Sequence, residues 1–176
     1  TVSPTFSAGI QGILHGWYDL DRDLRLRLGT RKSVSQPRLC VLLTCELCPG
    51  GDWARVVDAL AEAGVDMVQI REKSWPDGPL LRHAEAVRAR LPSSTRLVIN
   101  DRVAVAATLG LDVHLGQQDL PTLEARKLLG RDVHIGRSTS GLAEAQQAIA
   151  AGADLVGVGP MFVSATWTDA TLNNAL

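Results

Sequence analysis

The chain has 176 residues, of which 45% are hydrophobic and 21% are charged, and its formal net charge at pH 7 is -1. These values are typical of a globular protein with one sizeable core, and the near-neutral charge argues against nucleic acid or an anionic membrane as the main partner. No apolar run approaches the roughly 20 residues that a membrane span needs, so we expect a cytoplasmic protein.

Residues 1–37 show no clear helical or strand period, and they end in a stretch of Ser, Gln and Pro. The run Asp19–Arg27 alternates Leu with charged residues, which is compatible with a short helix, a strand or a poorly ordered leader. We therefore predict that residues 1–37 are an extension or linker, with disorder as an alternative, and that residues 38–176 form one domain.

From residue 38 onward, short apolar runs alternate with amphipathic segments. The runs are predicted to be strands, at 38–44, 67–71, 96–100, 112–115, 132–136 and 154–159, and the segments between them to be helices, at 53–64, 80–91, 103–110, 121–130 and 143–152. Strands that are almost continuously Val, Ile and Leu, joined by helices, indicate a parallel sheet covered by helices. Glycines near the helix ends predict C-caps, at Gly64, Gly110, Gly130 and Gly152.

Two α/β architectures fit this order, a doubly wound sheet and a parallel β/α (TIM-type) barrel. The turn after the first strand, CPGGDW, lacks the G-x-G-x-x-G pattern of a doubly wound phosphate site, and polar residues follow several different strands, as in a barrel. We therefore predict a barrel. We expect it to be incomplete, with about six of eight βα units, because only residues 160–176 follow the sixth strand. The expected reasons are truncation, a frame shift near Val163 or completion by a partner.

Cationic and amide side chains alternate along the second predicted strand. Gln69, Arg71 and Lys73 fall on one side of an extended segment, directly after Met67 and Val68. Two cations held this close need an anionic partner. Arg71 offers a planar fork for phosphate, Lys73 a mobile charge and Gln69 a neutral donor, so this segment predicts a phosphate site.

Two carboxylates follow the third and fourth predicted strands. Asp101, next to Asn100, and Asp119 are the hard oxygen ligands that Mg²⁺ prefers together with water and substrate phosphates. Asp101 is also placed to cap the helix that follows it, and Asp119 to cap the helix from Thr122. Both interpretations stay open on the residues alone.

Hydroxyl groups follow the fifth predicted strand. Ser138 and Thr139 lie in a turn flanked by Gly136, where they could cradle a phosphate or cap the helix from Leu142.

The histidines carry no recognisable ligand spacing. His114 and His134 lie in matching D-V-H-[LI]-G contexts and are predicted to be packed strand residues, and His83 is predicted to be structural or solvent-facing.

Three cysteines have C-x4-C-x2-C spacing, at Cys40, Cys45 and Cys48. The fourth cysteine of an iron–sulfur loop is absent, and an odd number of cysteines argues against a disulfide framework. Cys40 lies in an apolar run and is predicted to be buried.

Five blocks in order, VQIREK, VINDRVAVA, VHLGQQDLP, IGRSTS and GADLVGVGPMF, resemble the thiamine phosphate synthase family. This resemblance implies a β/α barrel that transfers the hydroxymethylpyrimidine group from its diphosphate to thiazole phosphate, with release of pyrophosphate and with Mg²⁺ as cofactor. The resemblance implies that the pyrimidine diphosphate is bound by Gln69, Arg71, Lys73, Asn100 and Ser138, of which Arg71, Lys73 and Ser138 also take part in catalysis. It implies that the metal ion is bound by Asp101 and Asp119, and the thiazole phosphate by Ser164 and Thr166.

The chain departs from this family pattern at two points. Trp167 stands where the family has a Lys. We also expect strands seven and eight, which supply a phosphate site in the family, to be absent from the 17 residues that follow Gly159. An inactive or binding-only remnant that retains the pyrimidine diphosphate half-site is therefore one alternative. A thiazole tautomerase is another, although its S-x-H block is here Ser138, Thr139 and Ser140. The expected partners are the two small-molecule substrates, with a homo-oligomer as an open alternative.

Overall fold

The computed structural model of the chain describes residues 39–159. These residues contain six strands, all parallel, in one sheet whose spatial order is the sequence order. The predictions for residues 1–37, Ser164, Thr166 and Trp167 lie outside the described residues. The strands are β1 (Cys40–Leu43), β2 (Met67–Ile70), β3 (Arg96–Asn100), β4 (Asp112–Leu115), β5 (Ile135–Thr139) and β6 (Leu155–Val158).

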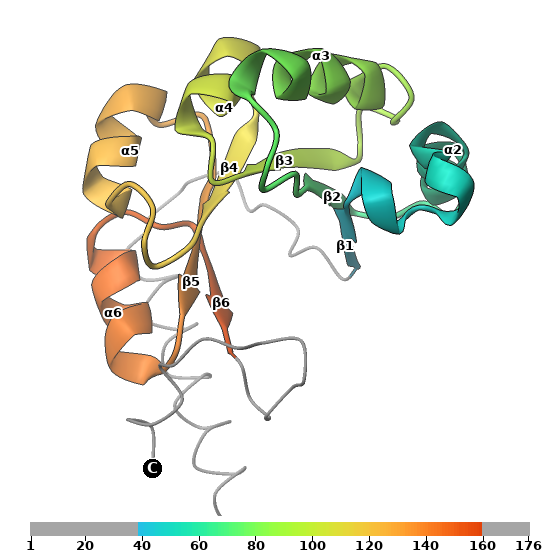
Figure 1. Cartoon of the computed structure of the whole chain (residues 1–176). Coiled ribbons are helices and arrows are strands. Elements are labelled where there is room, and N and C mark those ends of the chain that lie inside the picture. The colour runs from blue at the N-terminus through green and yellow to red at the C-terminus, as the bar shows by residue number, and fades with distance from the viewer. Residues whose placement is uncertain (1–38, 160–176) are drawn as a thin grey trace, which may run out of the picture.

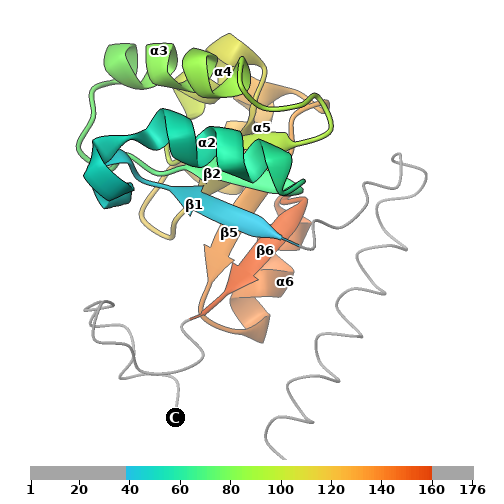
Figure 2. The same ribbon diagram turned by 90° about the vertical axis from the view of Figure 1, so that its right-hand side faces the viewer.

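A helical segment follows each of the first five strands, and together the helices cover one face of the curled sheet (Figures 1 and 2). This arrangement confirms the predicted α/β class and an incomplete TIM-type barrel. No helix in the described part of the chain is long and apolar enough to cross a membrane. The helical segments are η1 (Cys45–Leu47), η2 (Pro49–Gly51), α2 (Trp53–Glu62), α3 (Asp77–Arg88), α4 (Val103–Leu109), α5 (Thr122–Leu129) and α6 (Leu142–Ala150).

The hydrophobic core lies between the sheet and the helices. Alternate strand residues supply one side of it, as Val68 and Ile70 do in β2, and both are fully buried. Fully burying an aliphatic side chain of this size contributes about 1.5–3 kcal/mol, so the face toward the helices holds the sheet in place. Gln69, which lies between Val68 and Ile70 in β2, therefore lies on the opposite, concave face.

The concave face is open to water at the two end strands. Leu42 of β1 and Leu155 of β6 are 57% and 41% exposed. Cys40 is also exposed, so the prediction that it is buried is wrong. Alternation along β1 places Cys40 on the same face as Leu42, and within the described residues β1 pairs only with β2, which leaves this face uncovered.

The element boundaries agree with the sequence pattern to within two residues except at α3 and β5. The helix predicted at 80–91 spans Asp77–Arg88. The predicted C-cap glycines all have positive φ, for example Gly110, which ends α4 with φ 62° in the left-handed region. The fifth strand was predicted at 132–136, but it spans Ile135–Thr139. His134 precedes the strand because Asp112 Oδ1 accepts the hydrogen bond of the His134 N–H at 2.8 Å, and Ser138 and Thr139 are strand residues rather than turn residues.

Candidate functional site

The polar residues singled out in the sequence lie at one edge of the sheet, where the parallel strands end. Gln69 and Asn100 are in the last two positions of β2 and β3, and Ser138 is near the end of β5. Asp101 directly follows β3, whereas Asp119 lies in the loop between β4 and α5. Because the carboxyl ends of parallel strands meet at one edge, residues from four βα units reach one region, as in barrel enzymes.

Lys73 and Asp101 join two of these loops. Lys73 Nζ lies 2.5 Å from Asp101 Oδ2, and the Asp101 side chain is mostly buried whereas that of Lys73 is half-exposed. Arg102 Nη2 donates to the backbone oxygen of Lys73 at 3.1 Å and so holds the loop after β2 in place. The sequence reasoning did not single out Arg102, although it follows Asp101 directly in the VINDRVAVA block.

The backbone of Asp101 is in an unusual conformation. Its φ is 64°, and it is the one non-glycine residue with positive φ in the described part of the chain. Its N–H donates to the backbone oxygen of His114 at 2.8 Å, which ties the start of this loop to β4. Such conformations cost about 1–3 kcal/mol and cluster at active sites and ligand-binding sites, although Asp adopts positive φ more readily than most residues. The N-cap of α4 is Arg102, without a side-chain hydrogen bond, so Asp101 does not cap this helix.

Asp101 and Asp119 form a pair of interacting carboxyl groups. Burial raises the pKa of Asp119 above its usual range, and the hydrogen bond and negative charge of Asp101 raise it further. Burial opposes ionisation of Asp101 too, but the hydrogen bonds from Asp119 and Lys73 outweigh it, and the pKa of Asp101 is lowered. Two carboxyl groups this close favour a shared proton or a cation between them.

A backbone hydrogen bond orients Asp119 within its own loop. The N–H of Gly116 donates to Asp119 Oδ2 at 2.6 Å. The N-cap of α5 is Pro121, without a side-chain hydrogen bond, so the alternative in which Asp119 caps this helix is not observed. The carboxyl group therefore remains directed to Gly116 and Asp101.

Ser138 is held by His114 on the concave face. Ser138 Oγ lies 2.9 Å from His114 Nε2, which agrees with the prediction that His114 is a packed, hydrogen-bonded strand residue. Burial lowers the pKa of His114 despite the nearby Asp101 carboxylate. A side chain at Gly136 would overlap the His114 ring, so the site needs glycine there. The N-cap of α6 is Gly141, which leaves Ser138 outside that helix.

Arg71 and Lys73 line a small cavity of about 180 Å³ at the ends of β1 and β2. The N–H of Arg71 donates to the backbone oxygen of Leu43 at 2.8 Å, and the Thr44 hydroxyl donates to the backbone oxygen of Arg71 at 3.0 Å. These bonds fix the backbone of Arg71, while its half-buried side chain stays at the cavity. The structure thus brings together Lys73, Asp101 and Asp119, and it places Arg71 beside Lys73 in the cavity wall.

The described residues form a parallel β/α fold, and its cations and paired carboxylates lie at the carboxyl ends of the strands. These features define the class of barrel proteins whose functional sites lie at the carboxyl edge of the sheet. The sequence model of one family, described as thiamine monophosphate synthase, matches residues 39–175. The chain belongs to this family.

Individual relatives agree with this assignment. The chain is 38% identical over 169 residues to the thiamine-phosphate synthase of Prochlorococcus marinus (strain MIT 9313), an alignment that covers 93% of this chain and 48% of that protein. It is 42% identical over 120 residues to the thiamine-phosphate synthase of Gloeobacter violaceus, covering 67% of this chain and 35% of that protein. The chain thus spans about half the length, or less, of these curated relatives.

One solved structure is also similar. Thiamine phosphate pyrophosphorylase from Pyrococcus furiosus superposes with a TM-score of 0.63 at 28% sequence identity, over 70% of this chain and 60% of that chain. The same fold is therefore present in both proteins.

Proposed function

We propose that the chain carries out the thiamine phosphate synthase reaction, in which the hydroxymethylpyrimidine group passes from its diphosphate to thiazole phosphate and pyrophosphate leaves. The observation that supports this most directly is the meeting of Lys73, Asp101 and Asp119 at the carboxyl edge of the sheet. A cation beside paired carboxylates is the combination that a diphosphate and its metal ion require. Family membership supports the same reaction.

The donor set at this edge fits Mg²⁺. Asp101 and Asp119 offer only carboxylate oxygens, and the interaction that raises the pKa of Asp119 is relieved when a cation replaces the proton. We propose that these two residues hold Mg²⁺ together with the diphosphate. When bound, the ion neutralises part of the charge that develops on the departing pyrophosphate.

The remaining residues bind and orient the pyrimidine diphosphate. Arg71 and Lys73 stabilise the negative charge that grows on pyrophosphate as the carbon–oxygen bond breaks. Gln69 and Asn100, from neighbouring strands, offer amide groups to the pyrimidine ring, and Ser138 offers a hydroxyl whose position His114 maintains. The thiazole nitrogen then attacks the exposed carbon, so alignment of the two rings is the main contribution of the protein.

The direct test is turnover by the purified chain. It is incubated with hydroxymethylpyrimidine diphosphate, thiazole phosphate and Mg²⁺, and thiamine phosphate and pyrophosphate are measured together. The proposal expects equal amounts of both products, and a variant with Arg71→Met should form much less of either. A purified, folded chain that forms no thiamine phosphate would contradict the proposal.

The binding-only alternative gives a different result in the same experiment. All the described residues proposed for the pyrimidine diphosphate lie within 39–159, whereas Ser164 and Thr166, proposed for the thiazole phosphate, lie outside the described residues. Calorimetric binding of the pyrimidine diphosphate without turnover would therefore favour this alternative.

A further inference from the structure

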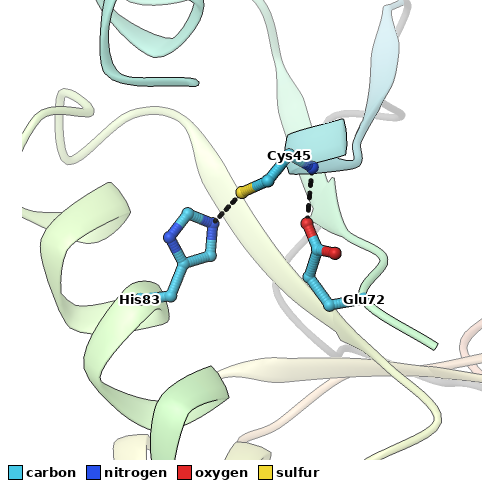
Figure 3. A group of neighbouring side chains, drawn as sticks. All are labelled: Cys45, Glu72 and His83. Carbon is cyan, nitrogen blue, oxygen red and sulfur yellow. Dashed lines mark hydrogen bonds between the residues drawn. The ribbon is translucent and has the colours of Figure 1, made fainter. Parts of the chain in front are cut away.

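Three potential ligand side chains from separate parts of the fold meet beside β1. Cys45 belongs to η1, Glu72 lies two residues after β2, and His83 lies on α3. Their ligand atoms all lie within 4.8 Å of one another, and Figure 3 shows the three side chains turned toward one another. Glu72 and His83 are buried and Cys45 is half-buried, so this is an internal cluster rather than a chance group of surface residues.

Glu72 is a buried carboxylate without a Lys or Arg partner in the described part of the chain. Its exposed fraction is 7%, and it forms no ion pair with any basic side chain of residues 39–159. One oxygen, Oε1, accepts the hydrogen bond of the Cys45 N–H at 2.6 Å. Burying an ionised carboxylate is costly unless a cation compensates it, and a bound metal ion would supply that charge.

The ring of His83 is held in a position suited to a ligand. Trp53 and Trp75 contact it edge-on, with ring centroids at 4.6 Å and 5.2 Å. Its Nε2 atom is thereby directed to Cys45 Sγ, 3.5 Å away. Burial lowers the pKa of His83, although the Glu72 charge opposes this, and the neutral imidazole is the form that binds metals.

The same cluster does not suit nucleophilic catalysis. Burial and the neighbouring Glu72 raise the pKa of the Cys45 thiol to about 12, whereas reactive cysteines have lowered pKa values. A metal ion changes this situation because it replaces the thiol proton and stabilises the thiolate.

We propose that Cys45, Glu72 and His83 form a binding site for Zn²⁺. A thiolate, an imidazole and a carboxylate are the ligand types that Zn²⁺ prefers, whereas Mg²⁺ takes oxygen ligands and avoids sulfur. Cys45 and Glu72 also line the cavity of about 180 Å³ that Arg71 and Lys73 line, so this cavity offers room for a water molecule as the fourth ligand. The ion would tie η1, the end of β2 and α3 together beside the diphosphate residues.

The first test uses the unmutated chain under reducing conditions. Zn²⁺ binding is measured by competition with a chromophoric chelator, and Co²⁺ is substituted to observe the absorption band of a cobalt–thiolate bond. The proposal expects stoichiometric Zn²⁺ binding and a cobalt–thiolate band in the full chain. Absence of either would overturn it.

The second test locates the ion with variants. Cys45→Ser and His83→Gln should each weaken Zn²⁺ binding by more than about tenfold, because loss of a direct ligand costs at least as much as loss of a group that only orients one. Two controls should bind Zn²⁺ as the unmutated chain does: Cys40→Ser, an exposed thiol at the other end of β1, and Asp101→Asn, which removes the carboxylate proposed for Mg²⁺. Unchanged Zn²⁺ affinity in Cys45→Ser, or loss of affinity in Asp101→Asn alone, would contradict the assignment.

Discussion

Lys73 Nζ lies 2.5 Å from Asp101 Oδ2, so the loops that follow β2 and β3 meet through an ion pair at the carboxyl edge of the sheet. The Lys73 side chain remains 54% exposed, whereas that of Asp101 is only 12% exposed. The cation is therefore free to turn toward a ligand, and the carboxylate is held in place. This asymmetry is what a site needs if Lys73 binds a diphosphate while Asp101 holds its metal ion.

Replacing Lys73 tests the proposed contact with the diphosphate. Lys73→Met keeps the length of the side chain but removes its charge. A hydrogen bond to a charged group contributes about 1.5–3 kcal/mol, so we expect the dissociation constant for hydroxymethylpyrimidine diphosphate to rise about 10–100-fold. Calorimetric titration measures it, and Lys127→Met on the exposed side of α5 is the matched control. Equal affinity in Lys73→Met and the unmutated chain would rule out the contact.

The carboxyl pair predicts a pH-dependent stability in the protein without metal. Because burial and Asp101 raise the pKa of Asp119, ionisation of Asp119 destabilises the folded state. This cost is absent below the pKa of Asp119 in the unfolded chain and complete above its pKa in the folded protein. Asp119→Asn should therefore raise the free energy of unfolding at neutral pH, by about 1 kcal/mol or less because the group is half-buried.

Urea unfolding at several pH values, with a chelator present, measures this effect. The difference between Asp119→Asn and the unmutated chain should disappear as the pH falls below about 4, the usual pKa of an aspartate. A gain in stability that grows with falling pH would have the wrong sign and would refute the interpretation.

Gly136 is predicted to be essential for the geometry around Ser138. A Cβ atom at this position would overlap the His114 ring, so Gly136→Ala forces the ring away from Ser138. Overpacking of this kind typically costs about 1–3 kcal/mol of unfolding free energy. Gly78→Ala is the control, because its Cβ would lie 3.8 Å from the nearest atom, within α3. Similar stabilities of both variants in urea would show that the overlap is relieved without cost.

A buried ion pair at the other end of the sheet is predicted to contribute to stability rather than to binding. Arg126 of α5 pairs with Asp154 and donates to the backbone oxygens of Gly130, Val133 and Gly152. Arg126→Met should lower the free energy of unfolding by about 3 kcal/mol, the low end for a broken buried pair, because Asp154 still accepts a hydrogen bond from the Ile135 N–H.

The neighbouring residue provides the control for this change. Lys127 pairs with Glu124 in an exposed position, so Lys127→Met should cost about 1 kcal/mol or less. Diphosphate affinity should be the same in the two variants. A larger loss of stability in Lys127→Met than in Arg126→Met would contradict the assignment.

The order of the elements could be predicted from the sequence because apolar periodicity and C-cap glycines act locally. The strands Arg96–Asn100 and Asp112–Leu115 were predicted with the bounds that the structure has. The strand predicted at 132–136 was displaced because a long-range hydrogen bond from His134 to Asp112 decides where β5 begins. Cys40 was misjudged because burial depends on which strand covers β1, and local hydrophobicity does not report this.

The candidate site was less accessible to sequence reasoning. The alternation of side chains along a strand predicted that Gln69 and Arg71 lie on the same side of it. The parallel topology predicted that Asp101 and Asp119 lie at the same edge of the sheet. The positive φ of Asp101 and its bond to His114 have no signal in the sequence. The approach of Cys45 to His83 has none either, because 38 residues separate them and only the packing of α3 on the sheet joins them.

The central claim is that Asp101 and Asp119 hold the metal ion on which diphosphate binding depends. The most direct measurement is calorimetric titration of hydroxymethylpyrimidine diphosphate into the purified chain, once with Mg²⁺ and once with a chelator. The titration compares the unmutated protein with Asp101→Asn and Asp119→Asn. The control is Asp58→Asn, which changes an exposed residue of α2. We expect tight binding only with Mg²⁺ in the unmutated and control proteins, and no effect of Mg²⁺ in the other two. Mg²⁺-dependent binding of undiminished affinity in both Asp101→Asn and Asp119→Asn would contradict the claim.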